Sequence, residues 1–139
     1  MSASASYDPV SRRSVVVLNS NDGLLVRLAE IGENAGFDVV TLNVMEIDRE
    51  PEAIQDFLKR HNPKVVVYGV EPPYPESWAL YRKVYEAELR SGSRRQFVVT
   101  TPNKEALEQH VGATSAIELA RDRIDRAAIE RAIQQAMLV

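Results

Sequence analysis

The stretch KVVVYGVEPPYP, residues 64–75, decides how this chain is expected to fold. Its continuous β-branched and aromatic run, Val65 to Tyr68, is typical of a strand that is buried on both faces. Gly69 and a proline-rich loop end the run. In open α/β sheets, reactive groups lie just beyond the carboxyl ends of such strands. Here that position is Gly69, which has no side chain and therefore no chemistry of its own.

The same kind of strand recurs along the chain, always followed by a segment with helical spacing. Strands are expected at residues 15–18, 37–42, 65–68 and 97–99, with a weaker fifth at 114–118. Helices are expected after residue 21, after Pro51, at about 76–90, at 102–107 and from Asp125 onward. Five short strands alternating with five helices predict an α/β protein, with a doubly wound, all-parallel sheet and right-handed crossovers.

Polar and small residues mark where several of these helices should begin and end. Asn21 or Asp22 can cap the first helix, and Gly36 is expected to end it. Asp125 is the expected N-cap of the last helix. Around that cap, Ile124 and Ile129 have the spacing of a hydrophobic staple.

The length and composition are those of one globular domain. The 139 residues are expected to form a loose N-terminal tail, residues 1–13, and one domain, residues 14–139. A net charge of −3 gives no electrostatic footprint for nucleic acid. The chain contains no apolar run of membrane-spanning length, so no membrane partner is expected. With no cysteine, disulfides and thiolate metal sites are excluded, which is consistent with a reducing, cytoplasmic location.

Three segments together resemble the response-regulator receiver domain, which has a CheY-like, flavodoxin-like fold. VVVYGVEPP resembles its third strand, where a proline follows the phospho-accepting aspartate; Pro73 matches that proline. FVVTT resembles the fourth strand, which ends in a switch Thr or Ser, here Thr100. GATSA resembles the Gly-Ala that opens the fifth strand, here Gly112 and Ala113. The resemblance covers about residues 15–138. The segment between Thr101 and Gly112 is shorter than is usual in the family, so the fourth helix is expected to be short.

The resemblance implies a phosphorylation site that has lost its charged groups. Receiver phosphorylation needs a nucleophilic carboxylate and a divalent cation held by acids. The nucleophile position falls on Gly69, and the two acidic positions fall on Asn19 and Ser20. Asp22 is nearby but is interpreted as a helix cap rather than a ligand, and Glu71 as a solvated loop residue.

The lysine of the family is also missing. Counting from Gly112 places that position at Leu119, whereas counting back from the last helix places it at Asp122, so the loop has been rebuilt. The switch position alone is kept, as Thr100. We therefore expect a degenerate pseudo-receiver that is not an enzyme and uses no cofactor.

No other reactive constellation is apparent in the sequence. His61 and His110 stand alone, and there is no phosphate-binding glycine loop or nucleophile elbow. The leading hypothesis is a phosphorylation-independent interaction module, whose partner is a protein of a two-component pathway or a second copy of itself. The alternative is a flavodoxin-like domain that binds a small molecule or nucleotide in the crevice beyond the strand ends. The expected crevice residues are Asn19, Ser20, Asn21, Gly69, Glu71, Thr100 and Thr101.

Two surfaces are candidates for such an interface. On the helix at 76–90, Leu80, Val84 and Ala87 are expected to face the sheet. Trp78, Tyr85 and Leu89 widen the apolar arc to about 200°, more than one buried face needs. Around the last helix, arginines mix with acidic residues, which suits pairing across a two-fold axis. These charged residues are Arg121, Asp122, Arg123, Asp125, Arg126, Glu130 and Arg131.

Overall fold

A computed structural model describes residues 13–120 and 123–139. Its five strands form one sheet of order β3-β2-β4-β5-β6, in which all neighbours are parallel. The strands are β2 (Ser14–Asn19), β3 (Asp38–Asn43), β4 (Val65–Gly69), β5 (Gln96–Thr101) and β6 (Ile117–Glu118). The order reverses between β2 and β4, as in flavodoxin-like sheets, so polar groups at that point share one edge.

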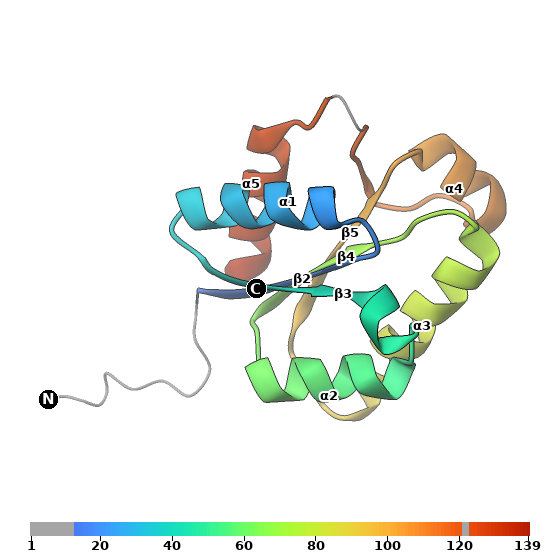
Figure 1. Cartoon of the computed structure of the whole chain (residues 1–139), viewed down its shortest axis with the longest axis horizontal. Helices are drawn as coiled ribbons and strands as arrows, with labels where there is room; N and C mark the ends of the chain where they lie inside the picture. The colour runs from blue at the N-terminus through green and yellow to red at the C-terminus, as the bar shows by residue number, and fades with distance from the viewer. Residues whose placement is uncertain (1–12, 121–122) are drawn as a thin grey trace, which may run out of the picture.

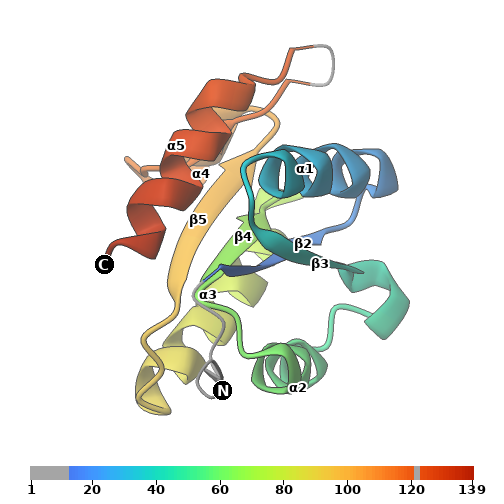
Figure 2. The same ribbon diagram turned by 90° about the vertical axis from the view of Figure 1, so that its left-hand side faces the viewer.

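Helices cover both faces of the sheet (Figures 1 and 2). They are α1 (Asp22–Asn34), η1 (Val44–Ile47), α2 (Pro51–His61), α3 (Tyr74–Arg90), α4 (Lys104–Val111) and α5 (Arg126–Met137). Side chains of α1 and α5 share one apolar core, and side chains of α2, α3 and α4 share the other. The expected doubly wound α/β architecture is therefore confirmed.

The two central strands are buried on both faces. The side chains of Val15, Val16, Val65 and Val66 are all 0% exposed. Successive side chains point to opposite faces of a strand, so Val15 and Val65 enter the core under α1 and α5. Val16 and Val66 enter the core under α2, α3 and α4. The valine runs in the sequence are continuous because both faces of these two strands are buried.

The caps agree with the sequence at three of the four expected positions. Asp125 accepts a hydrogen bond from the Ala128 backbone N–H, at 3.0 Å, and Gly36 adopts a positive φ just after α1. Asn21 is the N-cap of α1 and binds Leu24 N. Asp22 is not a cap, because it is the first residue of the helix itself.

The chain after β5 differs most from the expected elements. The fourth helix was expected at 102–107, but α4 begins at Lys104 because the Asn103 side chain caps it by accepting from Ala106 N at 3.0 Å. The helix continues to Val111 and ends at Gly112, whose φ is +84°. Gly112 is therefore a helix-terminating residue and does not open a strand.

The fifth strand is shorter than the expected range of 114–118. Side chains compete for the backbone before it begins. Glu108 accepts from the Thr114 N–H at 2.9 Å, and the Thr114 hydroxyl accepts from the Ala116 N–H at 3.2 Å. These bonds hold a turn, so only Ile117 and Glu118 pair with β5.

The buried face of α3 also differs from the expected one. Tyr81, Val84 and Glu88 are its buried row beyond the first turn, whereas Leu80 and Ala87 are half-buried. Glu88 is 7% exposed, and its Oε1 lies 2.7 Å from Arg95 Nε without the alignment of a hydrogen bond. Charge neutralisation by Arg95 makes this burial possible.

Arg13 is the first residue that the structure describes. Residues 1–12 of the expected tail lie outside the described residues. Arg13 was expected to be part of the tail, but its Nε donates to the Gly36 carbonyl at 2.6 Å, and its guanidinium lies over the Phe37 ring. In the described part of the chain, no helix is both long and apolar enough to cross a membrane.

The buried pair should behave as a unit in unfolding experiments. Glu88→Ala is expected to lower the free energy of unfolding by about 3–5 kcal/mol, since it removes the counter-ion of the largely buried Arg95 and leaves the hydrogen bond to Asn62. The double variant Glu88→Leu, Arg95→Met should unfold at nearly the wild-type denaturant midpoint. A Glu88→Ala protein as stable as wild type would contradict this account.

Candidate functional site

The positions expected at the degenerate site do meet in the structure. Asn19 and Gly69 end the adjacent strands β2 and β4, and Gly69 is in register with Thr100 of β5. By strand alternation, all three lie on the face of the core beneath α1 and α5. Leu119, just after β6, is buried in the same core.

The Asn19 side chain occupies the space above Gly69. A Cβ built on Gly69 would lie 2.8 Å from Asn19 Cγ and closer still to Asn19 Nδ2, which leaves no room for it. Asn19 is 1% exposed, and its Oδ1 accepts from the backbone N–H groups of Ser20 and Asn21, at 2.8 and 3.0 Å. Asn19 therefore fills the space above Gly69 and anchors the loop between β2 and α1.

The residues at this edge do not fit a divalent cation. Asn19 Oδ1 already accepts two hydrogen bonds, and Ser20 carries no charge. The nearby Asp22 carboxylate accepts a hydrogen bond from Asn43 Nδ2, at 2.8 Å, and thus binds the end of β3. Among the described residues, no three His, Cys, Asp or Glu side chains are placed to hold a metal.

Leu119 cannot play the part of the family's lysine. It is 2% exposed and packs in the same core as Ile129 and Ile133 of α5, while its N–H donates to Thr101 O at 2.8 Å. Asp122, the other residue that the count allows, lies outside the described residues. Of the two residues that could stand at the lysine position, the one that the structure describes therefore carries a buried apolar side chain.

The two threonines at the end of β5 face opposite ways. Thr100 is buried on the Gly69 side of the sheet. The Thr101 hydroxyl donates to the Tyr74 hydroxyl at 3.1 Å, and Tyr74 donates to the Asn103 carbonyl at 3.3 Å. This chain of bonds ties the start of α3 to the start of α4. Its residues were not expected to act together, because they are far apart in sequence.

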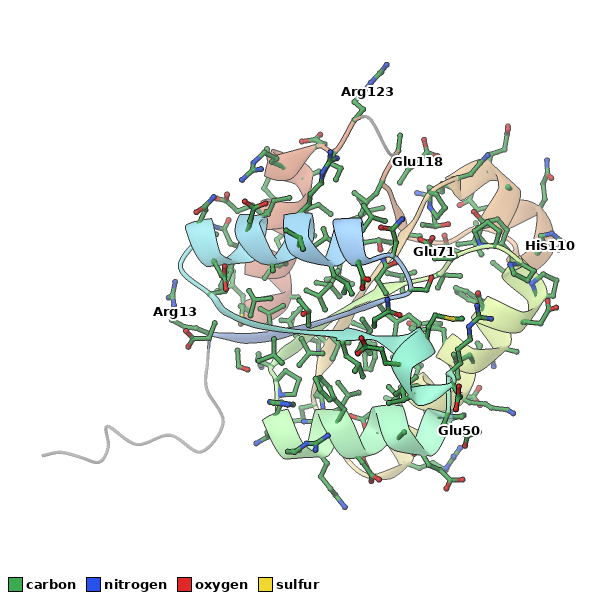
Figure 3. All side chains as sticks on the ribbon, in the orientation of Figure 1. Arg13, Glu50, Glu71, His110, Glu118 and Arg123 are labelled. Atoms are coloured by element: carbon green, nitrogen blue, oxygen red, sulfur yellow. The ribbon has the colours of Figure 1, made fainter. Side chains whose placement is uncertain are left out.

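A small cleft lies beside Gly69. It is lined by Ser20, Val44, Arg49, Tyr68, Gly69, Glu71, Ser77 and Leu80. Glu71, labelled in Figure 3, extends from the loop after β4 and has an interaction of its own. The volume is ≈ 20 Å³, enough for about one water molecule. Of the seven residues expected in the crevice, only Ser20, Gly69 and Glu71 line this cleft.

Two lining residues could not have been found by the strand-end rule. Tyr68 is 3% exposed, and its hydroxyl is buried with no hydrogen-bond partner among the described residues. Burial, with a smaller effect from Tyr81, raises the pKa of Tyr68 above its usual range, so the hydroxyl stays protonated. Arg49 reaches the cleft because Asp48 and Arg49 both adopt positive φ, which the sequence does not signal.

The aromatic residues proposed for an interface are partly in the core. Tyr85 packs edge-on against Phe97, with ring centroids 5.4 Å apart, and Trp78 packs against Tyr81 at 5.1 Å. Both are half-buried, whereas Leu89 is 56% exposed. The wide apolar arc of α3 is therefore covered in part by its own neighbours.

The arginines of the second candidate surface lie elsewhere. Arg123 and Arg126 are exposed beside α5, across the sheet from α3, and Arg121 lies outside the described residues. Figure 2 shows α5 and α3 on opposite sides of the sheet. The two candidate surfaces are thus separate and cannot form one patch. His61 and His110 are also apart; the first packs on Phe57 and the second lies near Tyr74.

Comparisons with known proteins agree with this architecture. No family model matches the sequence, and no curated protein is similar to it in sequence. The structure is similar to a response regulator from Thermotoga maritima, with a TM-score of 0.63, 21% identity, and coverage of 91% of this chain and 98% of that one. It is also similar to the signal receiver domain of a LuxO repressor protein from Vibrio parahaemolyticus, with a TM-score of 0.64, 9% identity and 91% coverage of both chains.

A third similarity widens the comparison beyond response regulators. The TIR domain heterodimer of RPS4 and RRS1 gives a TM-score of 0.64, with 14% identity and coverage of 91% of this chain and 99% of that one. The chain therefore has the fold of response-regulator receiver domains. That fold is shared with domains of other kinds, so the function must be argued from the site.

The contact between Asn19 and Gly69 can be tested by a double-mutant cycle. Gly69→Ala should lower the free energy of unfolding by about 1–3 kcal/mol, because the new methyl group overpacks the Asn19 side chain. In an Asn19→Ala background the same change should cost much less, which gives a measurable coupling energy in chemical denaturation. Equal costs in the two backgrounds would show that Asn19 does not fill this space.

Proposed function

We propose that this chain is a pseudo-receiver, a receiver-fold module that binds proteins without being phosphorylated. The observation that carries the proposal is the Asn19 side chain above Gly69, in the space where an attacking carboxylate would begin. Leu119, buried in place of the lysine, supports the same conclusion. A phosphoryl group at Gly69 would meet no carboxylate at positions 19, 20 or 69, and the buried Leu119 supplies no ammonium group.

The partner that we propose is a protein of a two-component pathway, or a second copy of this chain. The similarity to a TIR domain heterodimer supports a binding role to this extent: domains of similar architecture occur in a protein–protein complex. A ligand-binding role at the strand ends is less well supported. The cleft of ≈ 20 Å³ is far smaller than the pockets of about 300–1,000 Å³ that hold drug-sized ligands.

Each face of the sheet offers one surface for such a partner. On α3, the exposed Leu89 and the half-buried Trp78 and Tyr85 present apolar area of the kind that anchors interfaces. Beside α5, Arg126 and Arg131 lie among acidic residues, and both signs on one patch can pair across a two-fold axis. We assign self-association to the α5 surface and a different partner to the α3 surface.

Phosphorylation assays test the proposal directly. Acetyl phosphate with magnesium should add no phosphoryl group to the protein, as measured by intact mass. Gly69→Asp should not restore labelling, because the cation site and the lysine are still missing and Asn19 crowds the new side chain. A receiver with an intact site, treated in parallel, is the positive control. Stoichiometric labelling of an aspartate in the wild-type chain would refute the proposal.

Self-association should depend on the charges beside α5. At low salt and high micromolar concentration, light scattering should detect a dimer that dissociates as salt rises, since exposed ion pairs are screened. Arg126→Glu should favour the monomer. Lys83→Glu, the same charge change on an exposed residue of α3, should have no effect. A chain that stays monomeric at low salt would exclude this dimer.

A further inference from the structure

A second and larger cavity lies at the other end of the sheet, where the strands begin. Its volume is ≈ 510 Å³, within the range of pockets that hold small organic ligands. It is formed by the end of α2, the segment before β4 and the turn between α3 and β5. The lining residues that carry the argument are Lys59, Lys64, Ser91, Ser93, Arg94 and Arg95.

The charge of this cavity is opposite to that of the whole chain. Four of its lining residues are cationic and none is a carboxylate, although the chain carries a net charge of −3. The dipole of α2 favours cations near its end and accounts for Lys59. It does not account for Arg94 and Arg95, which come from the separate turn before β5.

Two neighbouring side chains, Glu88 and Asn62, fix the position of the Arg95 guanidinium. Glu88 lies 2.7 Å from its Nε, and Asn62 Oδ1 accepts from its Nη1 at 2.8 Å. Its Nη2 donors have no protein partner among the described residues. A buried ion pair contributes little to stability compared with apolar packing. The arrangement does fix a planar guanidinium at the cavity wall, with donors left over.

The turn between α3 and β5 keeps the cavity open. Its first three residues, Ser91, Gly92 and Ser93, have small side chains. The Ser91 hydroxyl binds the Glu88 carbonyl at 2.8 Å, and Gly92 has a φ of +80°, which favours glycine. Lys64 is engaged at the rim, where its Nζ donates to the Val139 carbonyl at 2.6 Å.

We propose that this cavity binds a small organic phosphate. A phosphate group matches a fixed guanidinium and flexible ammonium groups, because its oxygens accept several charge-assisted hydrogen bonds at once. The Ser93 hydroxyl accepts from the Arg95 N–H at 3.2 Å and keeps its own proton, so it can add one neutral donor. The cavity is at the opposite end of the strands from Gly69, so the proposal does not depend on the pseudo-receiver function.

The first experiment locates binding by NMR titration of the ¹⁵N-labelled full chain. Ribose 5-phosphate at low ionic strength should shift the amides of residues 59–62, 64 and 91–95, and those of residues 19–21 and 69–71 should stay unchanged. Ribose alone should shift nothing, and binding should weaken as salt rises. Inorganic phosphate, if it binds more tightly than ribose 5-phosphate, would overturn the organic part of the proposal. Shifts confined to residues 19–21 and 69–71 would overturn it entirely.

The second experiment measures the affinity for ribose 5-phosphate in variants that change one cationic side chain at a time. Lys59→Gln and Arg94→Gln alter exposed residues and should each weaken ribose 5-phosphate binding by up to about fivefold. Arg95→Lys keeps the charge next to Glu88 but loses the planar fork, so it should weaken binding more, by about tenfold. Arg123→Gln is the control for net charge, since Figure 3 places Arg123 at the far side of the molecule. Equal losses in all four variants would refute a specific site.

Discussion

The burial of β2 and β4 on both faces is the constraint on which the rest of this structure depends. Valines at 15, 16, 65 and 66 are wholly removed from water, so helices must cover both sides of the sheet. Parallel neighbours then require crossovers that bring the carboxyl ends of β2, β4 and β5 to one edge. The meeting of Asn19, Gly69 and Thr100 follows from this arrangement.

The edge that holds Asn19 and Gly69 is closely packed. The Asn19 side chain fills the space that Gly69 leaves. Its Oδ1 accepts hydrogen bonds from the Ser20 and Asn21 N–H groups and so fixes the loop between β2 and α1. Among the described residues, Asn19 Nδ2 and the Tyr68 hydroxyl have no hydrogen-bond partner; a buried group left without any partner costs roughly 1–3 kcal/mol. The edge is therefore shaped by packing rather than by chemistry.

The two ends of the sheet differ in the open space and in the fixed charge that they contain. At the carboxyl end, the cleft beside Gly69 has room for only about one water molecule. At the amino end, the buried pair of Glu88 and Arg95 keeps a guanidinium at the wall of a much larger cavity. Fixed charge and open space thus occur together at the amino end.

The sequence by itself determined the order of the elements and the parallel sheet, and it places no charged side chain at positions 19, 20 and 69. These follow from local patterns, since a valine run, a glycine or an N-cap aspartate acts through its immediate neighbours. The tertiary structure alone decided that Asn19 covers Gly69, that Glu88 is buried against Arg95, and that Tyr85 packs on Phe97. Each of these contacts joins separate elements, and its geometry depends on how the helices settle on the sheet rather than on any spacing along the chain.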